Sequence, residues 1–181
     1  MARVNVVDPK TASGETKELL DGVQQALGVT PNFIRVLANS PSALRAFLGL
    51  YQIAGSGTLE GATRERIALA VAEQNACQYC VSAHTAIGRK AGLDSAEMLK
   101  NRLGQSADPK ATAALQLAKS LVEHVGDVSD GELEAARRAG LGDAEIIEII
   151  THVTLNIFTN VLAKATRIDI DFPKVALGAA A

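Results

Sequence analysis

The sequence contains no tryptophan, and aromatic residues make up only 3% of its 181 positions. Proteins that bind single-stranded nucleic acid commonly stack bases on aromatic side chains, so this scarcity argues against such a surface. The net charge is −2, and no block of like charge interrupts the chain. Because nucleic acids and anionic membranes attract basic patches, we expect neither as a partner.

Long apolar runs are also missing. The run from Ile67 to Ala72 is far shorter than the roughly 20 residues that a membrane-spanning helix needs. The N-terminal residues show no apolar core followed by a cleavage site, so we expect a cytoplasmic protein. Only two cysteines are present, too few for a disulfide scaffold, and a close pair in a reducing compartment is typical of catalysis or metal binding.

Strand signals are nearly absent, because apolar residues recur at helical spacing along almost the whole chain. Glycine, proline and small polar residues mark the helix ends. The pattern therefore predicts an all-α fold and one domain over residues 1–181, with an irregular tail over about 168–181. The predicted helices are 13–28, 31–38, 41–55, 62–75, 77–91, 94–103, 109–125, 130–139 and 143–166.

Both cysteines lie within eight residues of a histidine, in the segment 77–84. On a helix, which turns by about 100° per residue, Cys77, Cys80 and His84 fall within an arc of roughly 60°. This arrangement is typical of a dithiol that closes to a disulfide beside a proton-transfer group. We expect the catalytic core to lie within about residues 58–92.

Two arguments select different sulfurs as the nucleophile. If Asn75 caps a new helix, Cys77 lies in its first turn, where unpaired N–H groups and the helix dipole favour a thiolate. Alternatively, His84 takes the proton of Cys80 from one helical turn away. In either case one sulfur attacks a peroxide or disulfide, and the other resolves the product.

Other interpretations of the pair are less favoured. A structural zinc site needs a fourth ligand, and only His124 and His152 remain as histidines, so we expect no metal. We interpret His124 as a residue near a helix C-terminus, where its charge pairs with the dipole, and His152 as a core or interface histidine. A thioredoxin-type pair follows a strand, which this chain lacks. Two buried, unreactive thiols beside an incidental histidine are the remaining alternative.

Two glutamates precede the cysteines. Glu65 lies twelve positions before Cys77, roughly 18 Å away along an unbroken helix. If the chain turns at residues 74–76, that helix folds back and brings the carboxylate towards His84, where it would orient the imidazole. The alternative is a solvated glutamate between two arginines. For Glu73, four residues before Cys77, we expect a surface position.

The pattern Glu65, eleven residues, Cys77-Gln-Tyr-Cys80, three residues, His84 resembles the signature of the alkylhydroperoxidase AhpD-like branch of the carboxymuconolactone decarboxylase family. Residues 64–84 are similar to that core, and residues 148–173 resemble the C-terminal part of its peroxidase-related members. The resemblance covers about residues 28–173. It implies an all-α, AhpD-like helical bundle that forms homo-oligomers, commonly trimers or hexamers, and reduces peroxides without a metal, flavin or other cofactor.

The resemblance also assigns roles. Cys80 corresponds to the peroxidatic thiol, Cys77 to the resolving thiol, and His84 with Glu65 to the proton relay. Tyr79 stands where the founding member has a relay histidine, and a phenol, which titrates near pH 10, does not shuttle protons near neutrality. Members without the cysteines decarboxylate a muconolactone, so the thiols argue against that reaction here.

We therefore expect thiol-dependent reduction of peroxides or disulfides. The expected partners are a peroxide or disulfide substrate and a thiol reductant, such as a lipoyl-bearing or thioredoxin-like donor. Two alternatives stay open: a redox sensor or interaction protein with little turnover, and an enzyme of the same fold that processes a lactone or carboxylate.

Overall fold

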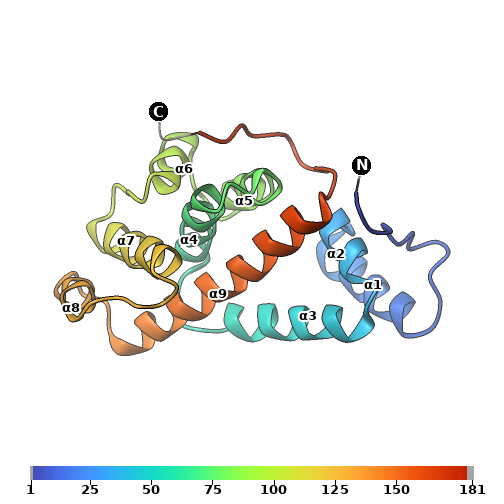
Figure 1. Ribbon diagram of the computed structural model, residues 1–181, viewed down its shortest axis with the longest axis horizontal. Coiled ribbons are helices and arrows are strands. Elements are labelled where there is room, and N and C mark those ends of the chain that lie inside the picture. Colours follow the sequence, from blue (N-terminus) through green and yellow to red (C-terminus); the bar gives the residue numbers. More distant parts are fainter. Residues whose placement is uncertain (1, 179–181) are drawn as a thin grey trace.

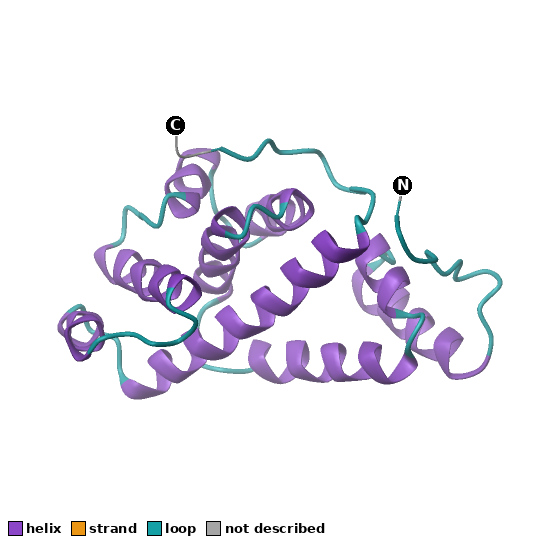
Figure 2. Cartoon of the chain, in the orientation of Figure 1, coloured by secondary structure: helices purple, strands orange, loops and turns teal. Residues whose placement is uncertain are grey.

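The computed structural model describes residues 2–178, and within that range every regular element is a helix (Figures 1 and 2). The all-α prediction is confirmed, and the predicted helices match the observed ones to within a residue or two at most ends. The helices are α1 (Gly14–Leu27), α2 (Asn32–Leu37), α3 (Pro41–Gly55), α4 (Gly61–Gln74), α5 (Gln78–Lys90), α6 (Ser95–Arg102), α7 (Pro109–Glu123), α8 (Asp130–Arg138) and α9 (Asp143–Thr166).

Helix α4 is the centre of the fold and packs against α5, α6, α7 and α9. Its segment from Ile67 to Ala72 is almost completely buried, as expected for a helix that is apolar on all sides. The long helix α9 runs obliquely past α4, with α3 along its other side (Figure 1). Helices α1 and α2 lie at one end of the molecule, and α7 and α8 at the other.

By length and composition alone, α9 is the one described helix that could cross a membrane. Its inner face is buried, with Ile149 and Val153 in contact with a cluster that α4 and α7 share. A helix that lies in the core of a folded chain passes the same test of length and hydropathy. We interpret α9 as such a core helix.

The apolar core has two main clusters of different composition. One surrounds α2, α3, the start of α5 and the tail, and it contains phenylalanine, tyrosine and both cysteines. The other joins α4, α7, α8 and the first half of α9. Among the described residues, the buried members of this second cluster are only alanine, valine, leucine and isoleucine. Aliphatic side chains are therefore sufficient to fill this second cluster.

A short reversal connects α4 to α5. Asn75 is the C-cap of α4, because its N–H donates to Val71 O at 3.0 Å. Ala76 follows with φ 49°, and Cys77 is the N-cap of α5. Asn75 therefore does not cap α5, so the condition under which Cys77 would lie in the first turn of that helix is not met: α4 continues through Gln74, and the left-handed Ala76 completes the turn. The reversal sets α4 and α5 side by side.

The tail after α9 is irregular, as predicted, over its described part, residues 168–178, while 179–181 lie outside the described residues. It packs on α5 of the same chain. Gln78 Nε2 donates to Val175 O at 3.1 Å, and the Val175 N–H donates to Ser82 Oγ at 3.1 Å. The tail therefore covers the N-terminal half of α5, which carries the cysteines.

The end of the tail is held by a buried ion pair. Arg102 binds Glu73 Oε2 at 2.8 Å, and these side chains are only 9% and 10% exposed. Arg102 also donates to Ala176 O, and the Gly178 N–H donates to Glu73 Oε1. The predicted surface position of Glu73 is therefore wrong, because α6 and the tail cover this turn of α4.

Candidate functional site

The two cysteines are joined by a disulfide, with their Cα atoms 5.3 Å apart. Both residues are buried, at 1% exposure for Cys77 and 3% for Cys80. The Cys80 N–H donates to Cys77 Sγ at 3.4 Å, so Cys77 satisfies a free N–H group at the start of α5. Only Cys80 lines the adjoining cavity. The spacing thus brings the sulfurs within bonding distance, and the fold exposes just one of them to the cavity.

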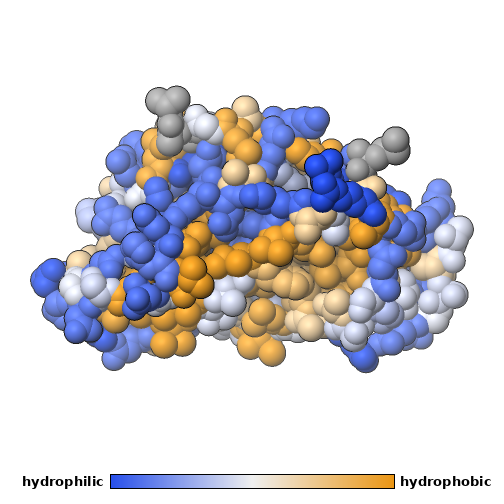
Figure 3. All heavy atoms as spheres, viewed as in Figure 1, coloured by the Kyte–Doolittle hydropathy of each residue, from blue (hydrophilic) through white to orange (hydrophobic). Residues whose placement is uncertain are grey.

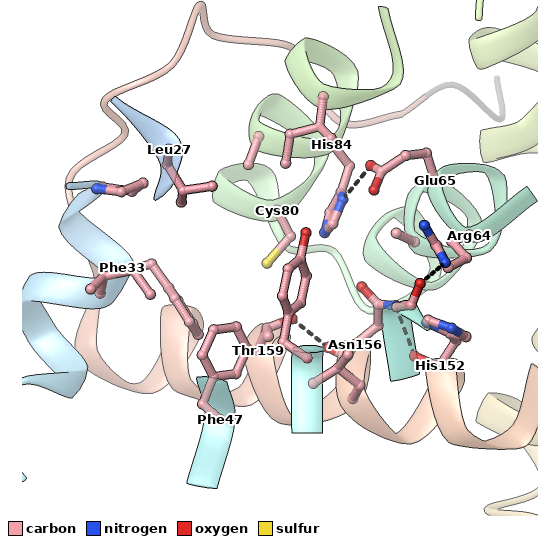
Figure 4. Close-up of a pocket in the computed structure, with 18 of the residues that line it drawn as sticks. Leu27, Phe33, Phe47, Arg64, Glu65, Cys80, His84, His152, Asn156 and Thr159 are labelled. Carbon is pink, nitrogen blue, oxygen red and sulfur yellow. Dashed lines mark hydrogen bonds and ion pairs between the residues drawn. The ribbon is translucent and has the colours of Figure 1, made fainter. Parts of the chain in front are cut away.

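His84 and Glu65 meet across the pair formed by α4 and α5. His84 Nδ1 lies 2.8 Å from Glu65 Oε2, and the side chains are 17% and 13% exposed. Because a carboxylate only accepts hydrogen bonds, Nδ1 carries the proton and Nε2 keeps a lone pair. Figure 4 shows the second ring nitrogen directed into the cavity, on the side of Cys80. The alternative of a solvated Glu65 is wrong, since the reversal after α4 folds it against α5.

The cavity beside Cys80 has a volume of about 500 Å³ and opens among α2, α3, α4, α5, α9 and the tail (Figure 4). Its volume is within the range of cavities that bind organic molecules. Polar groups are concentrated on the side formed by α4, α5 and α9. They include Arg64, Glu65, His84, His152, Asn156 and Thr159. The remaining wall is apolar and rich in aromatic rings.

His152 is buried, as expected for a core histidine, but it also lines this cavity. Its Nε2 lies 3.2 Å from Ala54 O, and a carbonyl accepts, so Nε2 carries the proton. Burial lowers the pKa of His152 below the ordinary value, which favours the neutral ring. Asn156 donates to His152 O at 2.8 Å. Sequence reasoning missed Asn156 as a cavity residue, although its i, i+4 spacing from His152 was a usable signal.

Tyr79 is part of the structure rather than of a proton path. The Phe33 N–H donates to its hydroxyl oxygen at 3.2 Å, and the residue is 7% exposed. Burial raises the pKa of Tyr79 far above the ordinary value, and the negative charge of Asp171 raises it further. The phenol therefore stays protonated near neutral pH.

His124 is the C-cap of α7.

Among the described residues, no group of three or more histidine, cysteine, aspartate or glutamate side chains is arranged to hold a metal ion. The polar groups of the cavity instead pair with one another or with backbone atoms. Arg64, for example, donates to Gly55 O. The site therefore combines a disulfide, whose Cys80 lines the cavity, with a histidine that is paired with a carboxylate.

Residues 41–120, which include both cysteines, Glu65 and His84, match the sequence model of the carboxymuconolactone decarboxylase family. No curated protein matches the chain. Several solved structures share its fold. An uncharacterized peroxidase-related protein from Silicibacter sp. TM1040 has a TM-score of 0.81 at 24% identity, covering 97% of this chain and 92% of that one.

Two further structures agree over similar lengths. The alkylhydroperoxidase AhpD core of a peroxidase-related protein from Ralstonia eutropha JMP134 has a TM-score of 0.83 at 23% identity, over 94% of this chain and 92% of that one. The debrominase Bmp8, as a cysteine-to-alanine variant in complex with 2,3,4-tribromopyrrole, has a TM-score of 0.78 at 19% identity, over 94% of each chain. At these identities the likeness shows an AhpD-like fold.

Proposed function

We propose that this chain, whose residues 41–120 match the sequence model of the carboxymuconolactone decarboxylase family, is a thiol-dependent peroxidase that uses Cys80 and Cys77. The observation that carries this proposal is the disulfide whose cavity-facing member, Cys80, shares the cavity with the His84–Glu65 pair. A disulfide is the oxidised half of a catalytic cycle in which the reduced pair is the electron donor.

In the first step, His84 Nε2 takes the proton of the Cys80 thiol, and the thiolate attacks the distal oxygen of a hydroperoxide. An S–O bond forms and the O–O bond breaks. The leaving alkoxide takes up a proton through His84, so the products are an alcohol and a sulfenic acid at Cys80. Glu65 holds the imidazole in the tautomer that this transfer requires.

In the second step, the Cys77 thiol attacks the sulfenic sulfur. The S–S bond forms and water leaves, which completes a two-electron reduction of the peroxide. A dithiol donor of the lipoyl or thioredoxin type then reduces the disulfide, and its own thiols become oxidised. The nearly complete burial of Cys77 supports its assignment as the resolving sulfur, because substrate in the cavity meets only Cys80. This cycle suits a cytoplasm, where such thiol donors are kept reduced.

The test begins with the reduced protein, mixed with one equivalent of an organic hydroperoxide while free thiols are counted. Loss of two thiols, and sustained peroxide consumption with dihydrolipoamide, are the expected results. The Cys80→Ser variant should show neither thiol loss nor peroxide consumption. The Cys77→Ser variant should form a sulfenic acid at Cys80, which dimedone traps. If both wild-type thiols persist, or if turnover survives in Cys80→Ser as expected for a lactone-processing enzyme, the proposal is wrong. Oxidation without turnover would identify a redox sensor instead.

A second candidate, reductive removal of bromide from an aromatic ring, is favoured by the likeness to the debrominase. Here the Cys80 thiolate takes the bromine, the ring carbon takes a proton, and Cys77 displaces bromide to form the same disulfide. Bromide release from a brominated pyrrole by the reduced protein, measured beside peroxide consumption, separates the two reactions.

We also propose that the chain forms a homo-oligomer, as a trimer or hexamer. Large apolar side chains are exposed on α3 and α9, including Ile53 at 72%, Ile147 at 62% and Val161 at 60%. Figure 3 shows apolar atoms gathered over the middle of one face of the molecule. Exposed apolar patches of this kind commonly mark contacts between subunits. Sedimentation of the purified protein measures the assembly, and a monomer would contradict this part of the proposal.

A further inference from the structure

The few aromatic residues of this chain are concentrated in one place. The sequence contains four phenylalanines, two tyrosines and no tryptophan. Five of these six rings line the cavity beside Cys80: Phe33, Phe47, Tyr51, Tyr79 and Phe172. They come from α2, α3, α5 and the tail, so no single amphipathic segment accounts for the grouping.

The five rings form a continuous row of contacts. Tyr51 stacks on Phe47 with ring centroids 5.8 Å apart, and Phe47 meets Phe33 edge-on at 5.1 Å. Phe33 lies 6.5 Å from Tyr79, which meets Phe172 edge-on at 5.7 Å. These separations are within the range at which aromatic pairs attract one another beyond simple burial. We call this set the aromatic row.

Phe33 and Tyr79 belong to the core cluster around α2 and α3, but all five rings of the aromatic row also line the cavity. The cluster around α4, α7 and α8 is packed with aliphatic side chains alone in the described part of the chain. Rings are instead used where the fold leaves an open volume of about 500 Å³. For scale, an apolar cavity of about 150 Å³ suffices to bind benzene.

The row lines the same cavity as Cys80 and His84. Tyr51 is 49% exposed, whereas Phe33 and Tyr79 are only 8% and 7% exposed. Figure 4 shows Phe33 and Phe47 on the side of the cavity away from Glu65 and Arg64, with Cys80 between the two sides. A ring that lies against the row is therefore in the cavity onto which Cys80 opens.

From this arrangement we infer that the substrate is a small aromatic molecule whose ring lies along the aromatic row. For the peroxidase proposed above, on which this inference rests, it is an aralkyl hydroperoxide, with the peroxide group on a saturated carbon attached to the ring, rather than hydrogen peroxide. The ring supplies binding energy that hydrogen peroxide, which is scarcely larger than water, lacks. Each aromatic contact adds about 0.5–1.5 kcal/mol beyond burial, which corresponds to a factor of roughly 2 to 12 in affinity.

The experiment compares substrates and a ligand that cannot react. Three hydroperoxides are used: cumene hydroperoxide, its analogue with cyclohexyl in place of phenyl, and tert-butyl hydroperoxide. For the wild type we expect kcat/KM to fall about threefold to tenfold from phenyl to cyclohexyl, and further for tert-butyl. Binding of cumyl alcohol, the non-oxidising product, is measured by saturation-transfer NMR on the intact chain.

Phe47→Leu removes one ring of the row but keeps an apolar side chain of similar size. It should weaken cumyl alcohol binding and bring the kcat/KM values for the phenyl and cyclohexyl hydroperoxides within about twofold of each other. Phe158→Leu is the matched control, because the Phe158 ring stacks on Phe47, with centroids 6.2 Å apart, but does not itself line the cavity. The Phe158→Leu variant should keep the wild-type preference for the phenyl over the cyclohexyl hydroperoxide.

The outcomes separate this inference from the proposed function. If cumyl alcohol binds in a Phe47-dependent manner but no peroxide is consumed, the aromatic site stands and the peroxidase proposal fails. If the three peroxides are consumed at equal kcat/KM and cumyl alcohol does not bind, the inference is overturned and the peroxidase proposal stands. Equal losses in Phe47→Leu and Phe158→Leu would also overturn it, because they would indicate a general loss of structure.

Discussion

The two sides of the cavity are built in different ways. One side, which we call the reactive side, contains Cys80, His84 and Glu65, the residues proposed above to react with substrate or transfer protons. These residues come from α4 and α5, which are joined by a turn of three residues. The aromatic row comes from α2, α3, α5 and the tail, with members as far apart in sequence as Phe33 and Phe172. Each side makes different demands: proton transfer needs fixed atom positions, whereas binding a ring needs only shape and surface.

This difference predicts that changes on the reactive side alter the rate of chemistry, while changes on the aromatic side alter affinity. The largest effect is expected for His84→Gln, which removes the base beside Cys80. Because general acid–base catalysis contributes about 10²- to 10⁴-fold, kcat should fall by that factor, with little change in cumyl alcohol binding. Stopped-flow measurement of thiol oxidation gives the rate directly.

Glu65→Gln should cause a smaller loss than His84→Gln, because the amide still fits beside the imidazole but no longer requires a proton on Nδ1. His124→Gln, at the end of α7 and outside the cavity, is the matched control and should leave the rate unchanged. A His84→Gln variant that reacts as fast as the wild type would show that the cysteine pair works without this relay.

The reactive side could be predicted from sequence, and the reason is physical. Helical spacing fixes where Cys77, Cys80 and His84 point relative to one another, and a single reversal decides whether Glu65 reaches them. Both are local properties, so the sequence contains them directly. The detail that sequence reasoning got wrong, the exposure of Glu73, depends on how α6 and the tail cover this turn of α4.

The aromatic row could not be predicted in this way. Phe33, Phe47 and Phe172 each look like ordinary core residues within their own segments, and only the packing of α2, α3 and the tail places them side by side. Their scarcity in the composition was the one available signal. It excludes a base-stacking surface as a whole, but it says nothing about whether the few rings gather in one place.

The next prediction concerns how the tail is held against α2. Asp171 Oδ2 accepts from the Asn32 N–H at 2.6 Å, at the first residue of α2. Losing a carboxylate cap of this kind costs about 0.5–2 kcal/mol. Asp171→Ala should therefore lower the free energy of unfolding by about that amount in urea titrations, and it should weaken cumyl alcohol binding because Phe172 is adjacent.

Asp127→Ala, an exposed aspartate in the loop before α8, serves as the control for loss of a surface charge. If both variants unfold at the same urea concentration as the wild type, the contact between the tail and α2 contributes nothing. In that event the aromatic row would be held by packing alone.

A smaller effect, about 1 kcal/mol, is expected for Tyr79→Phe, which removes the acceptor for the Phe33 N–H and keeps the ring. Burial raises the pKa of Tyr79 in the folded chain. Its contribution to stability is therefore complete below the unfolded pKa of about 10 and is lost as the pH rises above that value. Urea titrations at pH 7 and pH 11 should show a smaller alkaline loss in the variant.

Tyr79→Phe also tests whether this residue substitutes for a relay histidine. Because the phenol stays protonated, the dependence of kcat on pH should be the same in wild type and variant below about pH 9. A displaced pH profile would place Tyr79 on the reactive side instead of in the aromatic row. Unchanged activity with reduced stability is the expected result.

The smallest effect is expected at the reversal between α4 and α5, where Ala76 has φ 49°. A left-handed conformation costs a residue with a Cβ about 1–2 kcal/mol, and glycine avoids this cost but loses about 0.5–1 kcal/mol of chain entropy. Ala76→Gly should therefore raise the free energy of unfolding by up to about 1 kcal/mol, whereas Ala139→Gly, at the C-cap of α8 with φ −78°, should lower it. Neither residue lines the cavity, so cumyl alcohol should bind both variants equally. If Ala76→Gly unfolds at a lower urea concentration than the wild type, the left-handed conformation of Ala76 is not strained, because neighbouring residues stabilise it. The turn between α4 and α5 is then as stable as the rest of the fold.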